Sequence, residues 1–164
     1  MAAHSFGVSV VAMLMADECR ARGVELNVER VVRLALLHDL AESRTGDMPR
    51  TMALYYGAEA RRAAEGRAFA DLIAGLGDGL REEYGRLHAE YEERASVEAR
   101  LVKAADIVDL LAQALAFERA GARELDEFWE EAESREFGLE GAAREVVSET
   151  ISALVAARAE LRRV

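Results

Sequence analysis

The stretch VERVVRLALLHDLAES, from Val28 to Ser43, decides the fold of this chain. If it forms a helix, apolar side chains cover nearly all sides of it, and Asn27 directly before it is a favourable N-cap. The apolar positions are Val31, Val32, Leu34, Ala35, Leu36, Leu37, Leu40 and Ala41. Because a helix that is apolar on all sides belongs in a protein interior, we expect this one at the centre of a helical bundle.

The rest of the chain has the same helical character. The strong helix formers Ala, Leu, Glu and Arg dominate it, Pro49 is its single proline, and no segment alternates apolar and polar residues over strand length. We therefore predict an all-α fold, a compact bundle of about seven helices that forms one domain over residues 1–164. The helices are expected at about 3–22, 28–43, 58–74, 80–94, 96–120, around Trp129, and at 139–162.

The composition excludes several classes of protein. With 21 basic and 31 acidic residues the net charge is −10, which repels a nucleic-acid backbone. Cys19 is the single cysteine, so it cannot form an internal disulfide, and it is expected to be a packing residue in a reducing compartment. No apolar run is long enough to span a membrane, and the start lacks the basic residues of a secretory signal. These features predict a cytoplasmic protein that binds neither nucleic acid nor membrane.

Polar residues interrupt the apolar helix 28–43 near its end. His38, Asp39 and Glu42 lie there, and a buried carboxylate is costly unless it is paired or bound to a metal. Since Glu42 follows His38 by four residues, we expect both side chains on the same helical face.

Two further helices repeat this pattern. The helix 96–120 is apolar except for one stripe, Lys103, Asp106, Asp109 and Gln113, which either meets solvent or points at an interior partner. His4 opens the apolar helix 3–22. Together, His4, His38, Asp39 and Asp106 form a set of two imidazoles and two carboxylates. Such a set suits a divalent transition metal that keeps positions open for water or substrate.

The same residues carry a resemblance to a known family. His4, the His38–Asp39 pair and Asp106 resemble the H…HD…D signature of the HD-domain metal-dependent phosphohydrolases. The stretch LLHDLAESRTGDMPR (Leu36–Arg50) looks like the HD–x–x–E–x4–D block of that family, and EYEERASVEARLVKAAD (Glu90–Asp106) is similar to its 5′-deoxynucleotidase branch. This branch hydrolyses deoxynucleoside 5′-monophosphates to deoxynucleoside and phosphate, and the likeness extends to about Gln113.

The resemblance implies a role for each residue. His4, His38, Asp39 and Asp106 would bind a divalent ion (Mn, Co, Mg, Zn, Fe or Ni, which the ligands do not distinguish). Glu42 would handle the proton of the attacking water, and Asp47 would help to position that water or the leaving oxygen.

One departure from the family is expected to affect substrate binding. Family members carry an arginine and a tryptophan that contact the nucleotide ahead of the first ligand histidine, whereas here that histidine is residue 4 and the segment is expected to be missing. Phosphate binding would then depend on Lys103, Arg44 and Arg50. Family members commonly pair, and the apolar helices would permit a homodimer.

Several alternatives stay open from the sequence. The same site could act on another nucleotide, a triphosphate or a cyclic one, or the chain could be a catalytically silent protein that binds metal or nucleotide. Asp109 could support the metal site or lie on the surface. His88 is expected on a solvated face, and Trp129 in a local apolar cluster.

Overall fold

A computed structural model describes residues 2–48, 52 and 55–163 of the chain. These residues form an all-α fold, as predicted, and none of those described is in a strand. The helices are α1 (Ala2–Ala21), α2 (Val28–Leu37), α3 (Glu42–Thr45), α5 (Ala58–Ile73), α6 (Asp78–Glu93), α7 (Val97–Arg119), α8 (Asp126–Ser134) and α9 (Gly141–Leu161).

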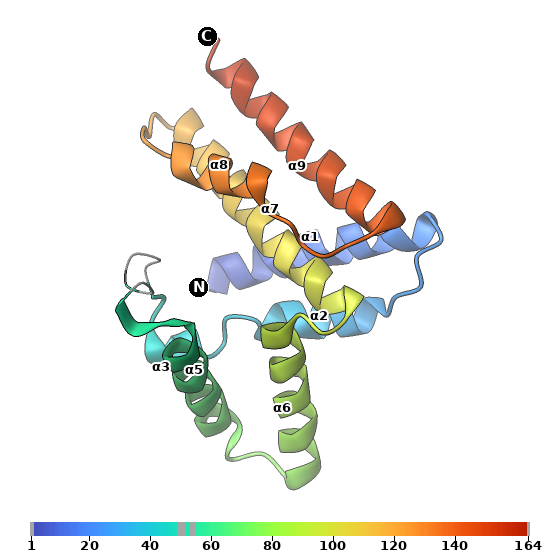
Figure 1. Cartoon of the computed structure of the whole chain (residues 1–164), viewed down its shortest axis with the longest axis vertical. Coiled ribbons are helices and arrows are strands. Elements are labelled where there is room, and N and C mark those ends of the chain that lie inside the picture. The colour runs from blue at the N-terminus through green and yellow to red at the C-terminus, as the bar shows by residue number, and fades with distance from the viewer. Residues whose placement is uncertain (1, 49–51, 53–54, 164) are drawn as a thin grey trace.

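Helices α1, α2 and α7 form the centre of the molecule (Figure 1). α1 packs along both α2 and α7, and residues with small side chains at the contact, such as Ala12, Ala16 and Cys19, are fully buried. Small side chains let helix axes approach closely, and α7 is buried on most of its circumference. The expected packing role of Cys19 is thereby confirmed. The three helices that carry His4, His38 and Asp106 are thus direct neighbours.

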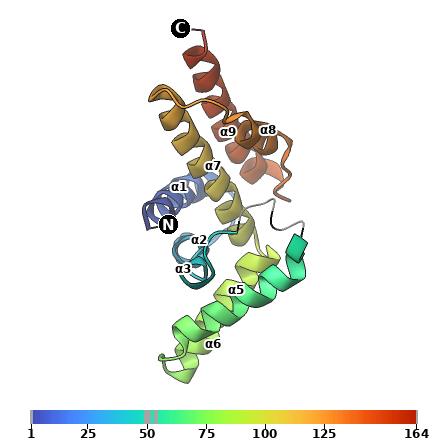
Figure 2. The ribbon, with the colours of Figure 1, turned by 90° about the vertical axis from the view of Figure 1, so that its left-hand side faces the viewer.

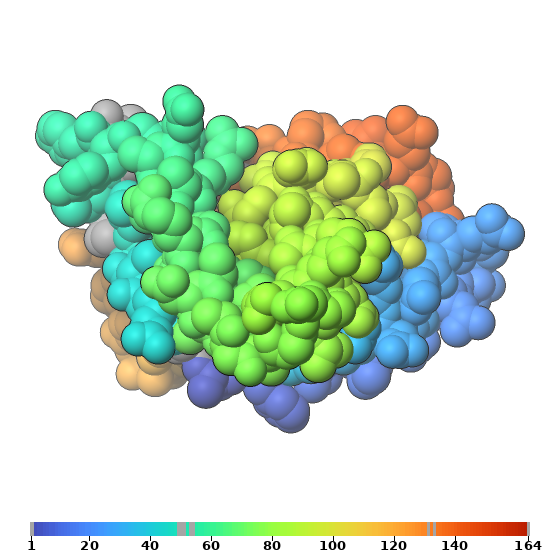
Figure 3. Space-filling model, turned by 90° about the horizontal axis from the view of Figure 1, so that it is seen from below, coloured from blue at the N-terminus to red at the C-terminus, as the bar shows by residue number. Residues whose placement is uncertain are grey.

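Two pairs of helices flank this centre. α5 and α6 form a hairpin at one end of the molecule, and α8 and α9 pack against α7 at the other (Figures 1 and 2). Seen from below, α5 and α6 make up most of the surface (Figure 3). A small second core of Ala41, Ala68, Phe69 and Ile73 joins α5 to the turn after α2. Trp129 of α8 is 1% exposed and belongs to the main core, with the guanidinium of Arg158 4.7 Å above its ring.

The predicted helix 28–43 is wrong at its end. Asn27 caps α2 as expected, with its Oδ1 accepting a hydrogen bond from the Arg30 N–H, but α2 ends at Leu37 and residues 38–41 form turns. There the Leu40 N–H donates to the Leu37 carbonyl (3.1 Å) and the Glu42 N–H to the Asp39 carbonyl (3.0 Å). Bonds to the third preceding residue wind the backbone more tightly than an α-helix, so His38 and Glu42 do not follow α-helical spacing.

In the part of the chain that the structure describes, none of the helices has the length and apolar content that a membrane crossing requires.

Candidate active site

The four predicted metal ligands converge, although they come from three separate parts of the chain. His4, His38 and Asp106 each offer one ligand atom, and these atoms all lie within 4.8 Å of one another. Asp39 Oδ2 lies 3.0 Å from His38 Nε2 and 3.5 Å from His4 Nε2, and Asp106 Oδ1 lies 3.1 Å from His4 Nε2. Ligands about 2.1 Å from one ion are roughly 3.0–3.5 Å apart, so these separations suit one cation.

The environment of His38 also fits a metal ion. The Nδ1–H of His38 donates to the Ala35 carbonyl (2.7 Å), which leaves Nε2 as the ring atom with a free lone pair. Among the described residues, this buried Nε2 has no partner in hydrogen-bonding geometry, although Asp39 is near. A buried nitrogen with an unused lone pair, close to carboxylates, is what a divalent ion would satisfy.

Asp109 holds the ring of His4 from the other side. The Nδ1–H of His4 donates to Asp109 Oδ2 (2.7 Å), and the Gln113 amide donates to the same carboxylate oxygen. This bond aims Nε2 of His4 at Asp39 and Asp106. Of the two alternatives for Asp109, a surface position or support of the site, the structure favours the second, because Asp109 is buried and contacts His4. Gly7, one turn after His4, allows this approach, because a Cβ at Gly7 would lie 2.1 Å from Asp109 Oδ1.

The two imidazoles of the cluster have raised pKa values, whereas Asp106 stays ionised. The hydrogen bond to Asp106, outweighing the opposing effect of burial, raises the pKa of His4 to about 9. Burial lowers the pKa of His38, but the neighbouring Asp39 carboxylate outweighs this and raises it overall. Burial raises the pKa of Asp106, yet His4 and Lys103 lower it well below its usual range. The carboxylates thus create a field that favours positive charge at this point, which a divalent cation would also supply.

A cavity of about 480 Å³ lies next to His38 and Asp39. It is lined by Ala41, Glu42, Ala58, Arg61, Arg62, Glu65, His88, Tyr91, Glu92, Glu93, Arg94, Lys103 and Arg135, besides those two residues. The side chain of Glu42 is 12% exposed. Burial, and then the charges of Asp39 and Asp47, raise the pKa of Glu42 to about 7. A carboxyl that titrates near neutrality can both accept and return a proton.

The predicted phosphate-binding residues differ in position. Lys103 lines the cavity, and its Nζ lies 2.6 Å from Asp106 Oδ2. Arg44 is exposed on α3 and does not line the cavity, and Arg50 lies outside the described residues. Asp47 is exposed after α3 and is not a lining residue either, although its charge acts on Glu42.

Several lining residues were missed by the sequence analysis. Arg61 and Arg62 come from α5, and the one signal in the sequence was the spacing of four residues between Arg61 and Glu65. The prediction that His88 lies on a solvated face is wrong: it is 9% exposed, its ring stacks on Phe69 with 4.2 Å between centroids, and it lines the cavity.

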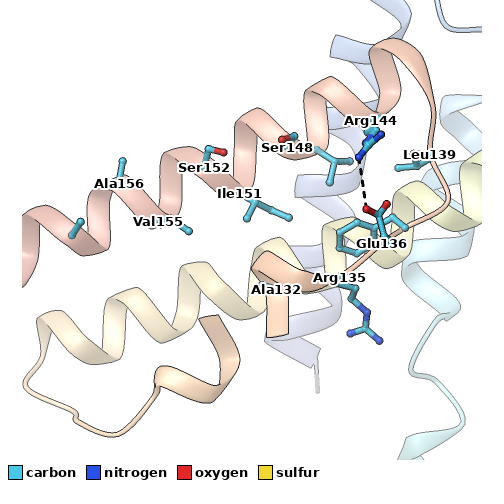
Figure 4. A pocket seen from close by; sticks show the side chains of 13 residues that line it. Ala132, Arg135, Glu136, Leu139, Arg144, Ser148, Ile151, Ser152, Val155 and Ala156 are labelled. Carbon is cyan, nitrogen blue, oxygen red and sulfur yellow. Dashed lines mark ion pairs between the residues drawn. The ribbon is translucent and has the colours of Figure 1, made fainter. Parts of the chain in front are cut away.

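A second hollow, of about 570 Å³, lies between α9 and the segment after α8 (Figure 4). Its wall is mainly apolar, with Ile151 and Val155 on α9, and Arg144 pairs with Glu136 near one end (3.7 Å). None of the predicted site residues that the structure describes lines it, so the chemistry of the site concerns the first cavity.

Known proteins resemble this chain in sequence. The 5′-deoxynucleotidase HDDC2 of Danio rerio is 34% identical over 134 residues, which are 80% of this chain and 63% of that protein. The human 5′-deoxynucleotidase HDDC2 is 35% identical over 115 residues, 70% of this chain and 52% of that protein. The yeast 5′-deoxynucleotidase YBR242W is 31% identical over 136 residues, 77% of this chain and 52% of that protein. The chain thus spans between about half and 63% of the length of these relatives.

Solved structures share the fold. A conserved hypothetical protein from Pyrococcus furiosus matches with a TM-score of 0.76 and 32% identity, over 94% of this chain and 82% of that one. The PH0347 protein from Pyrococcus horikoshii matches with a TM-score of 0.74 and 30% identity, over 95% and 82%. The HD domain family matches residues 1–144, which contain every residue of the convergent His and Asp cluster. The chain therefore belongs to the HD-domain family.

Proposed function

We propose that this chain is a metal-dependent phosphohydrolase that cleaves deoxynucleoside 5′-monophosphates to deoxynucleoside and phosphate. The observation that carries the proposal is the convergence of His4, His38, Asp39 and Asp106 beside a cavity lined by Glu42 and several cations. The substrate class is supported by relatives that are named 5′-deoxynucleotidases. A cavity of about 480 Å³ is large enough for one nucleotide.

The four ligands would hold one divalent ion. Two imidazoles and two carboxylates accept Mn, Co, Mg, Zn, Fe or Ni, so availability in the cell selects among them. When bound, such an ion acidifies a water molecule and stabilises negative charge on a phosphoryl oxygen. Asp109 would keep Nε2 of His4 directed at such an ion, as the outer-shell partner of a ligand histidine does.

Glu42 is the residue proposed to move the proton. Its carboxylate accepts a proton from the attacking water as the water oxygen bonds to phosphorus. The ester oxygen leaves with the electrons of the broken P–O bond and takes up a proton to become the 5′-hydroxyl of the deoxynucleoside. A group with a pKa of about 7 suits both transfers. Asp47 supports this role by its charge, which helps to keep Glu42 partly protonated.

Lys103 is proposed to link the metal site to the substrate. It contacts Asp106 and lines the cavity, so its ammonium group can balance charge on both a ligand and a phosphate. The homodimer and the cytoplasmic location stay predictions from the sequence, and sedimentation analysis of the purified chain tests the first.

The test is phosphate release by the metal-loaded chain from the common deoxynucleoside 5′-monophosphates, their ribonucleotides, dATP and cyclic AMP. We expect metal-stimulated release of inorganic phosphate from the deoxynucleoside monophosphates. Asp39→Ala should abolish it, whereas Asp17→Ala, which removes an exposed carboxylate of α1, should not. Pyrophosphate from dATP or a linearised nucleotide would assign the site to another substrate. No metal-stimulated cleavage of any ester would reject the hydrolase.

A further inference from the structure

Arg61 is a lining cation with a defined anchor. Its Nε–H donates to Glu65 Oε1 (2.7 Å), one turn further along α5. Its Nη2 lies 3.9 Å from Glu42 Oε1, too far for a hydrogen bond. One edge of the guanidinium is therefore fixed, while the other edge faces the part of the cavity that holds Glu42.

Glu65 is buried and pairs with Arg61. It is 7% exposed, and an ionised carboxylate in such a position is costly unless a cation pairs with it. Arg61 supplies that cation, and Glu65 in turn holds the side chain of Arg61 in place. The long side chain of Arg61 therefore loses less conformational freedom when a ligand binds. The pair thus presents a preset guanidinium to the cavity.

Three other cations of the cavity, Lys103, Arg62 and Arg94, are less suited to this task. Lys103 is engaged with Asp106 on the metal side. Arg62 is exposed, and its Nε–H donates at 3.4 Å to the carbonyl of Ala58. Arg94 is exposed at the C-terminal end of α6. Arg61 alone among these combines a buried carboxylate anchor with a position over Glu42.

We propose that Arg61 binds the phosphate dianion of the substrate and of the product through its Nη groups, and that Glu65 is the positioning residue that aims it. The inference rests on the proposed function and deepens it, because it assigns the phosphate subsite to α5. A guanidinium presents two parallel N–H donors that match two phosphate oxygens, an arrangement that an ammonium group cannot reproduce. A phosphate between Arg61 and the His and Asp cluster would have Glu42 beside it, where the attacking water must lose its proton.

The experiment measures inorganic phosphate binding to the Mn²⁺-loaded full chain by calorimetry, together with KM and kcat for dAMP. We expect Arg61→Gln to weaken phosphate binding at least about tenfold, since a charged bidentate contact is lost. KM should rise by a similar factor, with Mn²⁺ stoichiometry unchanged. Arg61→Lys, which keeps the charge, should recover only part of the affinity. Glu65→Gln should weaken phosphate binding severalfold while Arg61 is still present.

The matched control is Arg67→Gln, which removes an exposed arginine of the same helix that does not line the cavity. If Arg61→Gln and Arg61→Lys bind phosphate as Arg67→Gln does, the assignment is overturned while the hydrolase stands. Wild-type protein that binds Mn²⁺ but no phosphate also overturns it. If phosphate binding depends on Arg61 but no deoxynucleotide is cleaved, the subsite stands and the proposed function fails.

Discussion

Replacing Gly7 by alanine tests whether the metal site depends on the close contact of α1 with Asp109. A Cβ at this position would lie 2.1 Å from Asp109 Oδ1 and 2.9 Å from its Cγ, where 3.4 Å is the lower limit of ordinary contact. The carboxylate must then retreat by about 1.3 Å, the difference between 3.4 and 2.1 Å. We expect this shift of the carboxylate to break the 2.7 Å hydrogen bond from Nδ1 of His4 to Asp109 Oδ2 and to free that ring to rotate.

Two opposing terms set the stability of Gly7→Ala. Overpacking a filled site costs about 1–3 kcal/mol, and alanine in a helix regains about 1 kcal/mol relative to glycine. The net loss of unfolding free energy should therefore be about 0–2 kcal/mol. The effect on the metal should be larger, because losing the outer-shell partner of a ligand histidine typically weakens binding about 10–100-fold.

The assay is Mn²⁺ affinity by competition with a chelating dye, with urea unfolding of the metal-free chain measured in parallel. Gly85→Ala on α6 is the matched control, because its Cβ would meet nothing within 4 Å. It should gain up to about 1 kcal/mol and bind Mn²⁺ as the wild type does. If Gly7→Ala binds Mn²⁺ with wild-type affinity, the hydrogen bond that His4 donates to Asp109 does not orient the ring for metal binding.

Two further predictions concern pH. Because the pKa of His4 in the metal-free chain is raised to about 9, this ring carries a proton at pH 7 that an incoming ion must displace. Mn²⁺ affinity should then rise with pH until about 9, and His4 should release nearly one proton on binding near pH 7. Calorimetry in buffers of different ionisation enthalpy measures this proton release. A constant Mn²⁺ affinity between pH 7 and 9 would contradict the prediction. The second concerns Glu118, which is buried and whose pKa is lowered chiefly by its hydrogen bonds with Arg158. A carboxyl whose pKa is lowered in the folded state stabilises the fold at pH values above its usual pKa, and this stabilisation is lost as the pH falls. Glu118→Gln should therefore lower the unfolding free energy by about 1–3 kcal/mol at pH 7, and by progressively less below about pH 4.5. Urea unfolding at pH 7 and pH 4 measures both values, and an equal cost at the two pH values would contradict the ion pair.

Local sequence features were sufficient to predict most helices and to single out the His and Asp residues that converge. Asn27 and Ser96 cap α2 and α7 with their side-chain oxygens, as residue type alone suggests. His4, His38 and Asp106 stood out because each is a polar group in an apolar helix, and such helices must meet in one core. The match to the HD domain family over residues 1–144 agrees with this convergence, because the matched range contains all three residues.

The cavity beside the His and Asp cluster could not be predicted in this way. Arg61 and His88 lie on helices that look solvated in sequence, and they reach the site because the hairpin of α5 and α6 docks against the turn after α2. Asp109 likewise had two readings until the contact with His4 resolved them. Helical periodicity reports which side of one helix is apolar, whereas the wall of a cavity depends on the angles at which several helices pack. Those angles arise from side chains far apart in the chain, so no local pattern encodes them.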